Sequence, residues 1–256
     1  MALFESGNPT LSEKIFSKSM GEASYGQMTV RGAIQKFGFL LLMVIAGAAY
    51  TWKLYFEGAF PTMMILFWVG LIGGLISAFV IMFKPEWAKY LAPAYGLLEG
   101  FVVGGLSAIV NNSVQAKYPN IVLQAVLLTF GVAFAIFLLY NFRIIKPTQK
   151  FKAIIISASF GILLLYLVTW ILGMFGVNMS FMSWNDASPL GIGVNLFVIA
   201  IAALSLVLDF EQIEVGEQMG APKYMEWYGA FGLLVTMIWL YIQILKLLSR
   251  FASNRN

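Results

Sequence analysis

The sequence lacks two residue types on which many functional sites depend. There is no cysteine and no histidine among its 256 residues. The first absence excludes disulfides, thiolate nucleophiles and cysteine-based metal sites. The second removes the commonest metal ligand and the usual side chain that titrates near neutral pH. A response to pH in this range must therefore use carboxyl groups whose surroundings alter their protonation.

Charged residues are also scarce. They make up 11% of the chain, whereas a soluble domain carries roughly 25%. Hydrophobic residues make up 60%, and the mean hydropathy is +0.83. One water-facing globule cannot bury so much apolar surface, so we expect an integral membrane protein whose main partner is the lipid bilayer. The net charge of +4 reflects basic residues beside the membrane segments and does not indicate a nucleic-acid partner.

Seven apolar stretches approach the roughly 20 residues that a spanning helix needs. We therefore predict an all-α protein with seven transmembrane helices, and no soluble domain between them. Residues 1–30 are polar and lack the apolar core of a signal peptide, so we expect a flexible cytoplasmic tail before a membrane domain at 31–250. Residues 251–256 form a short polar tail. The predicted spans are 34–52, 61–83, 91–110, 120–142, 153–175, 189–210 and 227–249.

Lysine and arginine in the short loops predict the orientation. With the N-terminus inside, the inner segments contain most of these residues, and the loop from Arg143 to Lys152 is the strongest evidence. Lys246, Arg250 and Arg255, placed in an outer tail, argue locally against this orientation. Six spans with one re-entrant segment would put both ends inside, which is an alternative.

Two carboxyl groups lie in predicted spans, where an ionisable residue is a functional candidate. Glu99 is in the third span, and Asp209 is near the inner end of the sixth. The alternative for Glu99 is a structural carboxyl that is paired or neutral. The alternative for Asp209 is a helix-end residue that reaches water. Uncharged polar residues that could partner them, or simply join helices by hydrogen bonds, are Gln124, Asn141, Asn195 and Gln243.

Three more acids follow Asp209. Glu211, Glu214 and Glu217 are spaced three apart, so in a helix they lie along one side. They could form an acidic inner mouth that concentrates cations. The alternative is a solvated connecting loop.

Small residues predict where helices pack closely. Gly70 and Gly74 are four apart in the second span, and Gly96, Gly100 and Gly104 repeat at the same spacing in the third. Such faces let two backbones approach. Five of the tryptophans fall near predicted span ends, as interfacial residues do. We expect the other two, Trp68 and Trp239, to pack inside the protein.

The residue inventory argues against an enzyme. Serine and zinc proteases of the membrane need histidine. An aspartyl protease needs two aspartates on facing spans, but the only aspartates are Asp209 and the loop residue Asp186. Lys246 lies too near the end of its span for a retinal protein. We expect no catalysis and no cofactor.

The chain resembles bacterial members of the Bax inhibitor family, also called the transmembrane Bax inhibitor motif family. Three stretches carry the resemblance, in the family's order, between about residues 28 and 250. They are KYLAPAYGLLEGFVVGGLSAIV, YPNIVLQAVLLTFGVAFAIFLLY and LDFEQIEVGEQMGAPKYMEWYGAFGLLVTMIWLYIQILKLLSR.

The resemblance implies six helices packed around a central seventh in the bacterial inner membrane. It also implies a pH-sensitive calcium leak, in which aspartates on spans six and seven share a proton. Other relatives restrain a membrane-bound AAA protease or act in stress responses. The resemblance therefore leaves two alternative functions. The protein is either a channel that conducts calcium or a regulator that conducts no ions. We expect a monomer.

Asp209 matches the family's span-six aspartate, but the span-seven aspartate is replaced by Gln243 in LYIQ. Two close carboxylates cannot both ionise easily, and an Asp–Gln pair lacks that repulsion. Gln243 could instead donate a hydrogen bond to Asp209. Glu99 is an addition relative to the family, so we hypothesise that Glu99 and Asp209 form the proton-sensitive ion pathway. Carboxylates suit Ca²⁺ as a permeant ion, and we assign no bound metal.

Overall fold

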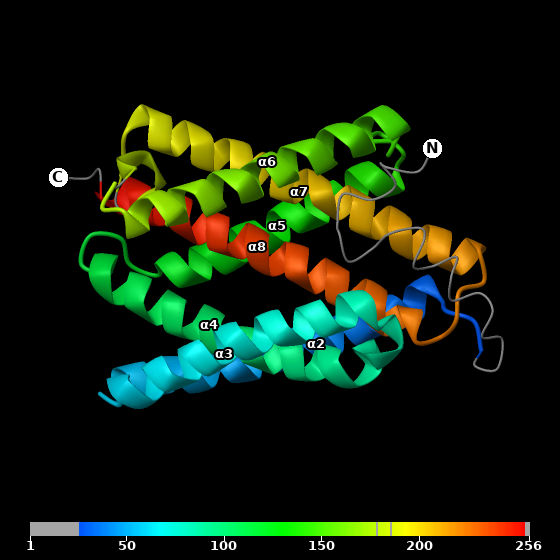
Figure 1. Ribbon diagram of the computed structural model, residues 1–256, viewed down its shortest axis with the longest axis horizontal. Coiled ribbons are helices and arrows are strands. Elements are labelled where there is room, and N and C mark those ends of the chain that lie inside the picture. Colours follow the sequence, from blue (N-terminus) through cyan, green and yellow to red (C-terminus); the bar gives the residue numbers. More distant parts are fainter. Residues whose placement is uncertain (1–25, 178, 185, 254–256) are drawn as a thin grey trace. The chain divides into compact units, whose positions relative to one another are not determined.

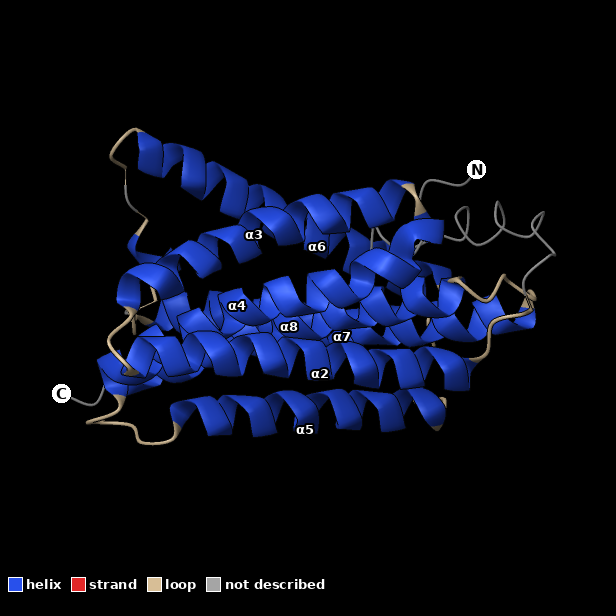
Figure 2. Cartoon of the chain, turned by 90° about the horizontal axis from the view of Figure 1, so that it is seen from below, coloured by secondary structure: helices blue, strands red, loops and turns tan. Residues whose placement is uncertain are grey.

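The computed structural model describes residues 26–177, 179–184 and 186–253, and within them it contains seven long α-helices (Figure 1). Each is long and apolar enough to cross a membrane, which confirms the predicted all-α fold with seven spanning helices. Short loops join the helices (Figure 2). In chain order the elements are α2 (Val30–Phe56), α3 (Phe60–Phe83), the short 3-10 helix η1 (Pro85–Trp87), α4 (Ala88–Val114), α5 (Ile121–Asn141), α6 (Gln149–Met174), η2 (Ser180–Met182), α7 (Pro189–Gln218) and α8 (Met225–Ser253).

The predicted tails lie mostly outside these ranges. Of the expected N-terminal tail at 1–30, the structure describes 26–30, and of the C-terminal tail at 251–256 it describes 251–253. The latter three residues belong to α8 and not to a separate tail.

Local sequence accounts for where several helices begin. The side chain of Thr29 accepts a hydrogen bond from the backbone N–H of Gly32 at 2.9 Å, which caps α2. Thr148 caps α6 in the same way. Proline lies at the start of α3 and α7, where its missing N–H leaves no helical hydrogen bond unmade.

The sixth span is longer than hydropathy predicts. We expected it to end near residue 210, but α7 continues to Gln218. The helix ends at a left-handed turn, in which Gly220 has a φ of 68°. Hydropathy marks the apolar part of a helix and not its end, because Glu and Gln are good helix formers in water. Glu211, Glu214 and Glu217 therefore lie on a helix and not in a connecting loop.

The last span also continues past its predicted end. Lys246 and Arg250 lie within α8 and are only 6% and 1% exposed, so they do not belong to an outer tail. The inside position of the N-terminus stays a prediction.

The chain divides into two compact units. Among the described residues, the α2–α4 unit comprises 26–109 and 208–235, and the α5–α6 unit comprises 110–207 and 236–253. Helices α4, α7 and α8 contribute residues to both. Glu99 and Asp209 belong to the first unit, whereas Asn195 and Gln243 belong to the second.

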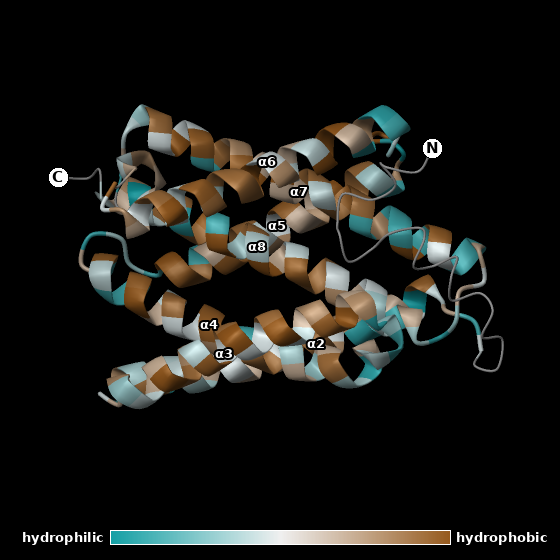
Figure 3. Cartoon of the chain, viewed as in Figure 1, coloured by the Kyte–Doolittle hydropathy of each residue, from teal (hydrophilic) through white to brown (hydrophobic). Residues whose placement is uncertain are grey.

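Apolar side chains cover the outside of the helices, as in a protein dissolved in lipid. Hydrophobic residues run along the middle of the helices (Figure 3), and many large ones are exposed, such as Ile65 at 63% and Leu75 at 64%. Trp68 is 53% exposed, so the prediction that it packs inside was wrong. Hydropathy cannot distinguish a tryptophan that faces lipid from one that faces another helix.

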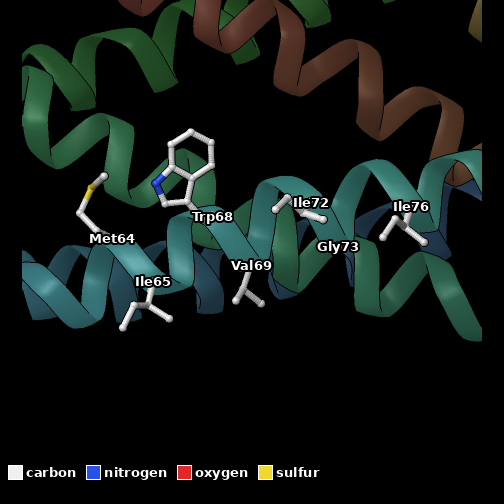
Figure 4. A pocket seen from close by; sticks show the side chains of 7 residues that line it. All are labelled: Met64, Ile65, Trp68, Val69, Ile72, Gly73 and Ile76. Carbon is white, nitrogen blue, oxygen red and sulfur yellow. The ribbon is translucent and has the colours of Figure 1, made fainter.

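Trp68 lines an open apolar hollow along α3 (Figure 4). All seven lining residues come from this one helix, from Met64 to Ile76. A furrow between side chains of a single helix is where lipid chains are expected to lie, and it offers no polar group for a specific ligand.

The seven helices differ in how much of their surface is buried. For α8, 78% of the 18-residue apolar window is buried, against 11% for α6. This is the burial that a central helix requires. The packing of the other six around α8 stays a prediction.

Candidate functional site

The glycines of α4 bring α2 into close contact, as their spacing predicted. A Cβ atom at Gly100 would lie 2.9 Å from the Cα atom of Gly47 and would also meet the Val44 carbonyl oxygen. One turn further on, a Cβ atom at Gly104 would meet the backbone of Ala48. The two backbones therefore touch along this face, and only glycine fits between them.

Helix α4 also packs against α3, and the contact is made at glycines of α3. A Cβ atom at Gly70 would meet the carbonyl oxygen of Leu98, and one at Gly73 would lie 3.1 Å from the Leu98 side chain. This confirms that Gly70 and Gly74 lie on a packing face. Residues 98 and 99 of α4 are consequently held against α3.

Glu99 lies at this contact between α3 and α4. Its Oε1 would be 3.0 Å from a Cβ atom at Gly74. Its carboxyl group is also hydrogen-bonded to the Tyr95 hydroxyl, one turn earlier in α4. Tyr95 is 5% exposed and makes an edge-to-face contact with Phe231 of α8, with 4.8 Å between ring centroids. Packing and one hydrogen bond thus fix the direction in which Glu99 points.

Asp209 is completely buried, with 0% of its surface exposed. It lies nine residues before the end of α7, so it is not the helix-end residue reaching water that was the alternative. A buried carboxyl in a spanning helix is costly, about 3 kcal/mol on insertion scales. Such a residue persists where its neighbours stabilise it or where it has a function.

The end of α7 packs on the beginning of α8. A Cβ atom at Gly229 would lie 2.9 Å from Cγ1 of Ile213, so glycine is needed for this approach. Gln212 and Ile213 are each 3% exposed. The helical turn that follows Asp209 is therefore part of the packed interior.

The three acids after Asp209 have separate environments. Glu217 accepts a hydrogen bond from the backbone N–H of Val30 at 2.9 Å, at the start of α2. Glu214 accepts one from the Gln218 side chain at 3.3 Å. Glu211 and Glu214 are partly buried and Glu217 is exposed. Glu217 therefore stabilises a helix start, and the acidic inner mouth stays a prediction.

Sequence reasoning missed one buried acid of the α2–α4 unit. Glu226, in the first turn of α8, is 1% exposed. Its carboxylate accepts hydrogen bonds from the backbone N–H of Thr29 at 3.0 Å and from its hydroxyl at 3.1 Å. It also forms an ion pair with Lys36. Glu226 lies just outside the predicted seventh span, so a search for polar residues within spans could not find it.

Two of the uncharged polar residues, Asn195 and Gln243, meet in the α5–α6 unit. Asn195 of α7 donates from Nδ2 to the Gln243 side-chain oxygen at 3.1 Å and to its backbone oxygen at 3.2 Å. The Tyr166 hydroxyl of α6 donates to the same side-chain oxygen at 3.4 Å. Asn195 and Gln243 are 2% and 5% exposed. Gln243 therefore joins three helices through its carbonyl oxygen.

Gln124 has a local role. Its side chain donates to the carbonyl oxygen of Pro119 at 3.2 Å, just before α5 begins. This hydrogen bond stabilises the start of its own helix, and it does not join two spans.

Two basic residues of α8 lie inside the α5–α6 unit. The guanidinium group of Arg250 donates to the carbonyl oxygens of Phe181, Ser183 and Gly191, which precede or begin α7. The Lys246 ammonium lies 5.9 Å from the Tyr166 ring and 6.0 Å from the Trp184 ring. Arg250 therefore holds the connection between α6 and α7 against the end of α8.

Within the described ranges, no group of three or more acidic residues is placed to hold a metal ion. The candidate site is therefore the pair of buried or partly buried carboxyls, Asp209 and Glu99, within the α2–α4 unit. Such groups can exchange protons and attract cations without binding one permanently.

A family model described as Bax inhibitor 1 like matches residues 8–253, nearly the whole chain. Searches with the chain itself match no curated protein and no solved structure.

Proposed function

We propose a function from one premise: this chain belongs to the Bax inhibitor 1 like family and is a multi-pass membrane protein. The proposed function is a cation leak, with Ca²⁺ as the permeant ion, that is controlled by protonation of carboxyl groups inside the protein. The protein would act in a bacterial inner membrane with its N-terminus in the cytoplasm. The observation that carries the proposal is the complete burial of Asp209 within a spanning helix.

Asp209 suits a proton-controlled step for a physical reason. A buried carboxyl is far more sensitive to its surroundings than an exposed one, because the charged form loses its hydration. Gaining a proton removes a charge from the interior, and losing it restores an attractive site for a cation. Asp209 would therefore couple proton binding to the passage of an ion.

Glu99 would supply the second carboxyl. It belongs to the same unit as Asp209 and is held by Tyr95 and by its contact with α3. Gln243 contributes differently in this proposal, because its carbonyl oxygen accepts hydrogen bonds from Asn195 and Tyr166. It would stabilise the packing of helices and would not titrate.

Ion flux into liposomes tests the proposal. The purified protein would be reconstituted with a Ca²⁺ indicator inside, and influx would be followed as pH is varied. We expect Asp209→Asn to lose most of the pH dependence and Glu99→Gln to alter it, because neither amide can exchange a proton. Glu57→Gln is the matched control, since this acid is 56% exposed in its side chain and only pairs with Lys53 at 3.6 Å. Identical pH profiles in all four proteins would refute the proposal.

The competing function is a non-conducting regulator that restrains a membrane-bound AAA protease or another stress-response partner. A protein that gives no flux above empty liposomes at any pH would favour it. Removal of residues 1–25 tests a role of the tail and keeps the contacts of Gln27 and Met28. Gln27 pairs with Pro222, and the N–H of Met28 donates to the Ala221 carbonyl oxygen at 2.8 Å, so a longer deletion would damage the fold itself.

A further inference from the structure

A second site lies at the end of the α2–α4 unit where α2, α4 and α8 begin. It is a hollow with a volume of about 490 Å³, lined by residues from all three segments. This is within the roughly 300–1,000 Å³ of typical small-molecule sites. The residues that matter for its chemistry are three lysines, one glutamate and four aromatics: Lys36, Lys89, Lys223, Glu86, Trp87, Tyr90, Tyr224 and Trp227.

The charge facing the hollow is positive. Lys36 and the buried Glu226 form an ion pair and balance each other. Lys89 and Lys223 are exposed at the rim, and Lys89 lies 4.8 Å from the Tyr90 ring. Among the described lining residues, these lysines outnumber the acids, which are represented by Glu86 alone. Lys84 adds a further charge nearby, with its ammonium 4.9 Å from the Trp87 ring. An anion is therefore the favoured ligand.

The aromatic residues indicate that the site is at the membrane surface. Trp87 and Tyr90 are 49% and 70% exposed, although both are large and partly apolar. Tryptophan and tyrosine with this exposure at helix ends are typical of the headgroup layer. The indole N–H and the phenol O–H are also hydrogen-bond donors that a phosphate oxygen can accept.

The wall of the hollow is firmly built. The Trp227 ring contacts Phe39 edge to face, with 6.0 Å between centroids, and the Lys36 ammonium lies 5.5 Å from the Trp227 ring. Lys36 is held in turn by Glu226, which also binds Thr29. These contacts hold Lys36 and Trp227 in place on one side of the hollow.

From these features we infer that the hollow binds the phosphodiester headgroup of an anionic phospholipid, with Lys89 and Lys223 contacting the phosphate and Trp87 and Tyr90 lying beside the lipid. Basic pockets between spanning helices bind anionic headgroups by the same chemistry. The inference does not depend on the proposed ion leak, because it uses neither Asp209 nor Glu99.

Native mass spectrometry of the full chain in detergent tests it. Phosphatidylglycerol and phosphatidylcholine would be titrated separately, and bound lipid would be counted. We expect the anionic lipid to bind more tightly to the wild-type chain. The double variant Lys89→Gln, Lys223→Gln should weaken that binding about 30-fold and leave the zwitterionic lipid unaffected.

A second double variant, Lys146→Gln, Lys150→Gln, is the matched control. It removes the same charge from two exposed lysines at the start of α6, Lys146 just before the helix and Lys150 in its first turn, neither of which lines the hollow. We expect it to bind phosphatidylglycerol as the wild type does. Equal losses in the two double variants would show only a general charge effect and overturn the inference.

Two further measurements test the sign of the charge and the source of the phosphate. Glu86→Gln should strengthen phosphatidylglycerol binding, because it removes the one acid at the rim. Excess inorganic phosphate should displace little of the lipid, and complete displacement would mean a site for a soluble anion, which contradicts the inference. Unchanged thermal unfolding of each variant without added lipid would show that the substitutions leave the fold intact.

Discussion

Lys36 of α2 and Glu226 of α8 form an ion pair although 190 residues separate them in the chain. The two side chains differ in their access to water, at 20% and 1% exposed. Because Glu226 also binds Thr29, this pair attaches the start of α2 to the start of α8.

The unequal burial of this pair predicts unequal effects of substitution. Lys36→Met leaves a buried carboxylate without its cation, and we expect a loss of about 3 kcal/mol in the free energy of unfolding. Glu226→Gln should cost less, because the amide oxygen can still accept from Thr29 and Lys36 can reach water. Denaturant unfolding in detergent micelles measures both.

The exposed pair of Lys53 and Glu57 is the control for that comparison. Its nitrogen–oxygen distance is 3.6 Å, and both side chains are more than half exposed. Lys53→Met should change the free energy of unfolding by less than about 1 kcal/mol. A larger loss for Glu226→Gln than for Lys36→Met would contradict the reasoning from burial.

The contact between α2 and α4 predicts that Gly100 tolerates no side chain. Gly100→Ala should cost about 2 kcal/mol, because the added methyl group meets backbone atoms that cannot move aside. A methyl group added at Gly131 of α5 would meet no atom within 4 Å, so Gly131→Ala should be neutral or stabilising. Thermal unfolding of the two variants side by side checks this, and equal destabilisation would show that the close contact does not form.

The position of Glu99 predicts a functional effect from its neighbour in α3. Gly74→Ala places a methyl group 3.0 Å from Oε1 of Glu99. The carboxyl group must shift, so we expect the pH profile of Ca²⁺ flux to change in the same direction as in Glu99→Gln. Gly73→Ala meets Leu98 instead and should keep the wild-type profile. If Gly73→Ala changes the profile as much, the effect belongs to general packing.

The hydrogen bonds between Asn195 and Gln243 predict a modest coupling. In membrane proteins such interhelical bonds contribute about 0.6 kcal/mol. A double-mutant cycle with Asn195→Leu and Gln243→Leu, measured by unfolding in bicelles, should therefore give a coupling energy near this value. Strictly additive losses would mean that the two side chains stabilise the protein independently.

The hydrogen bonds of Arg250 predict that its replacement loosens the backbone before α7. Its guanidinium group donates to three backbone carbonyls around the beginning of α7, and an ammonium group cannot reproduce this planar set of donors. Arg250→Lys should increase amide hydrogen exchange in residues 179–191 while exchange in α2 and α3 stays unchanged. Faster exchange throughout the chain would indicate global destabilisation instead.

The sequence by itself determined the class and the number of spans. The mean hydropathy of a segment depends only on its own residues, so the apolar run 61–83 is recognisable without knowing which helices pack beside it. The structure has α3 at Phe60–Phe83. The glycine spacings in α3 and α4 were equally clear, because four-residue periodicity defines a helix face. Both features depend only on residues near each other in the chain.

Only the tertiary structure decided the partners of the polar residues. Glu226 binds Lys36 and Thr29, and Arg250 binds carbonyls about 60 to 70 positions earlier. Trp68 is 53% exposed. Each outcome depends on which helix lies beside which, and at what rotation. The sequence gives the charge and the size of each side chain. The packing of segments distant in the chain decides which atoms that side chain contacts.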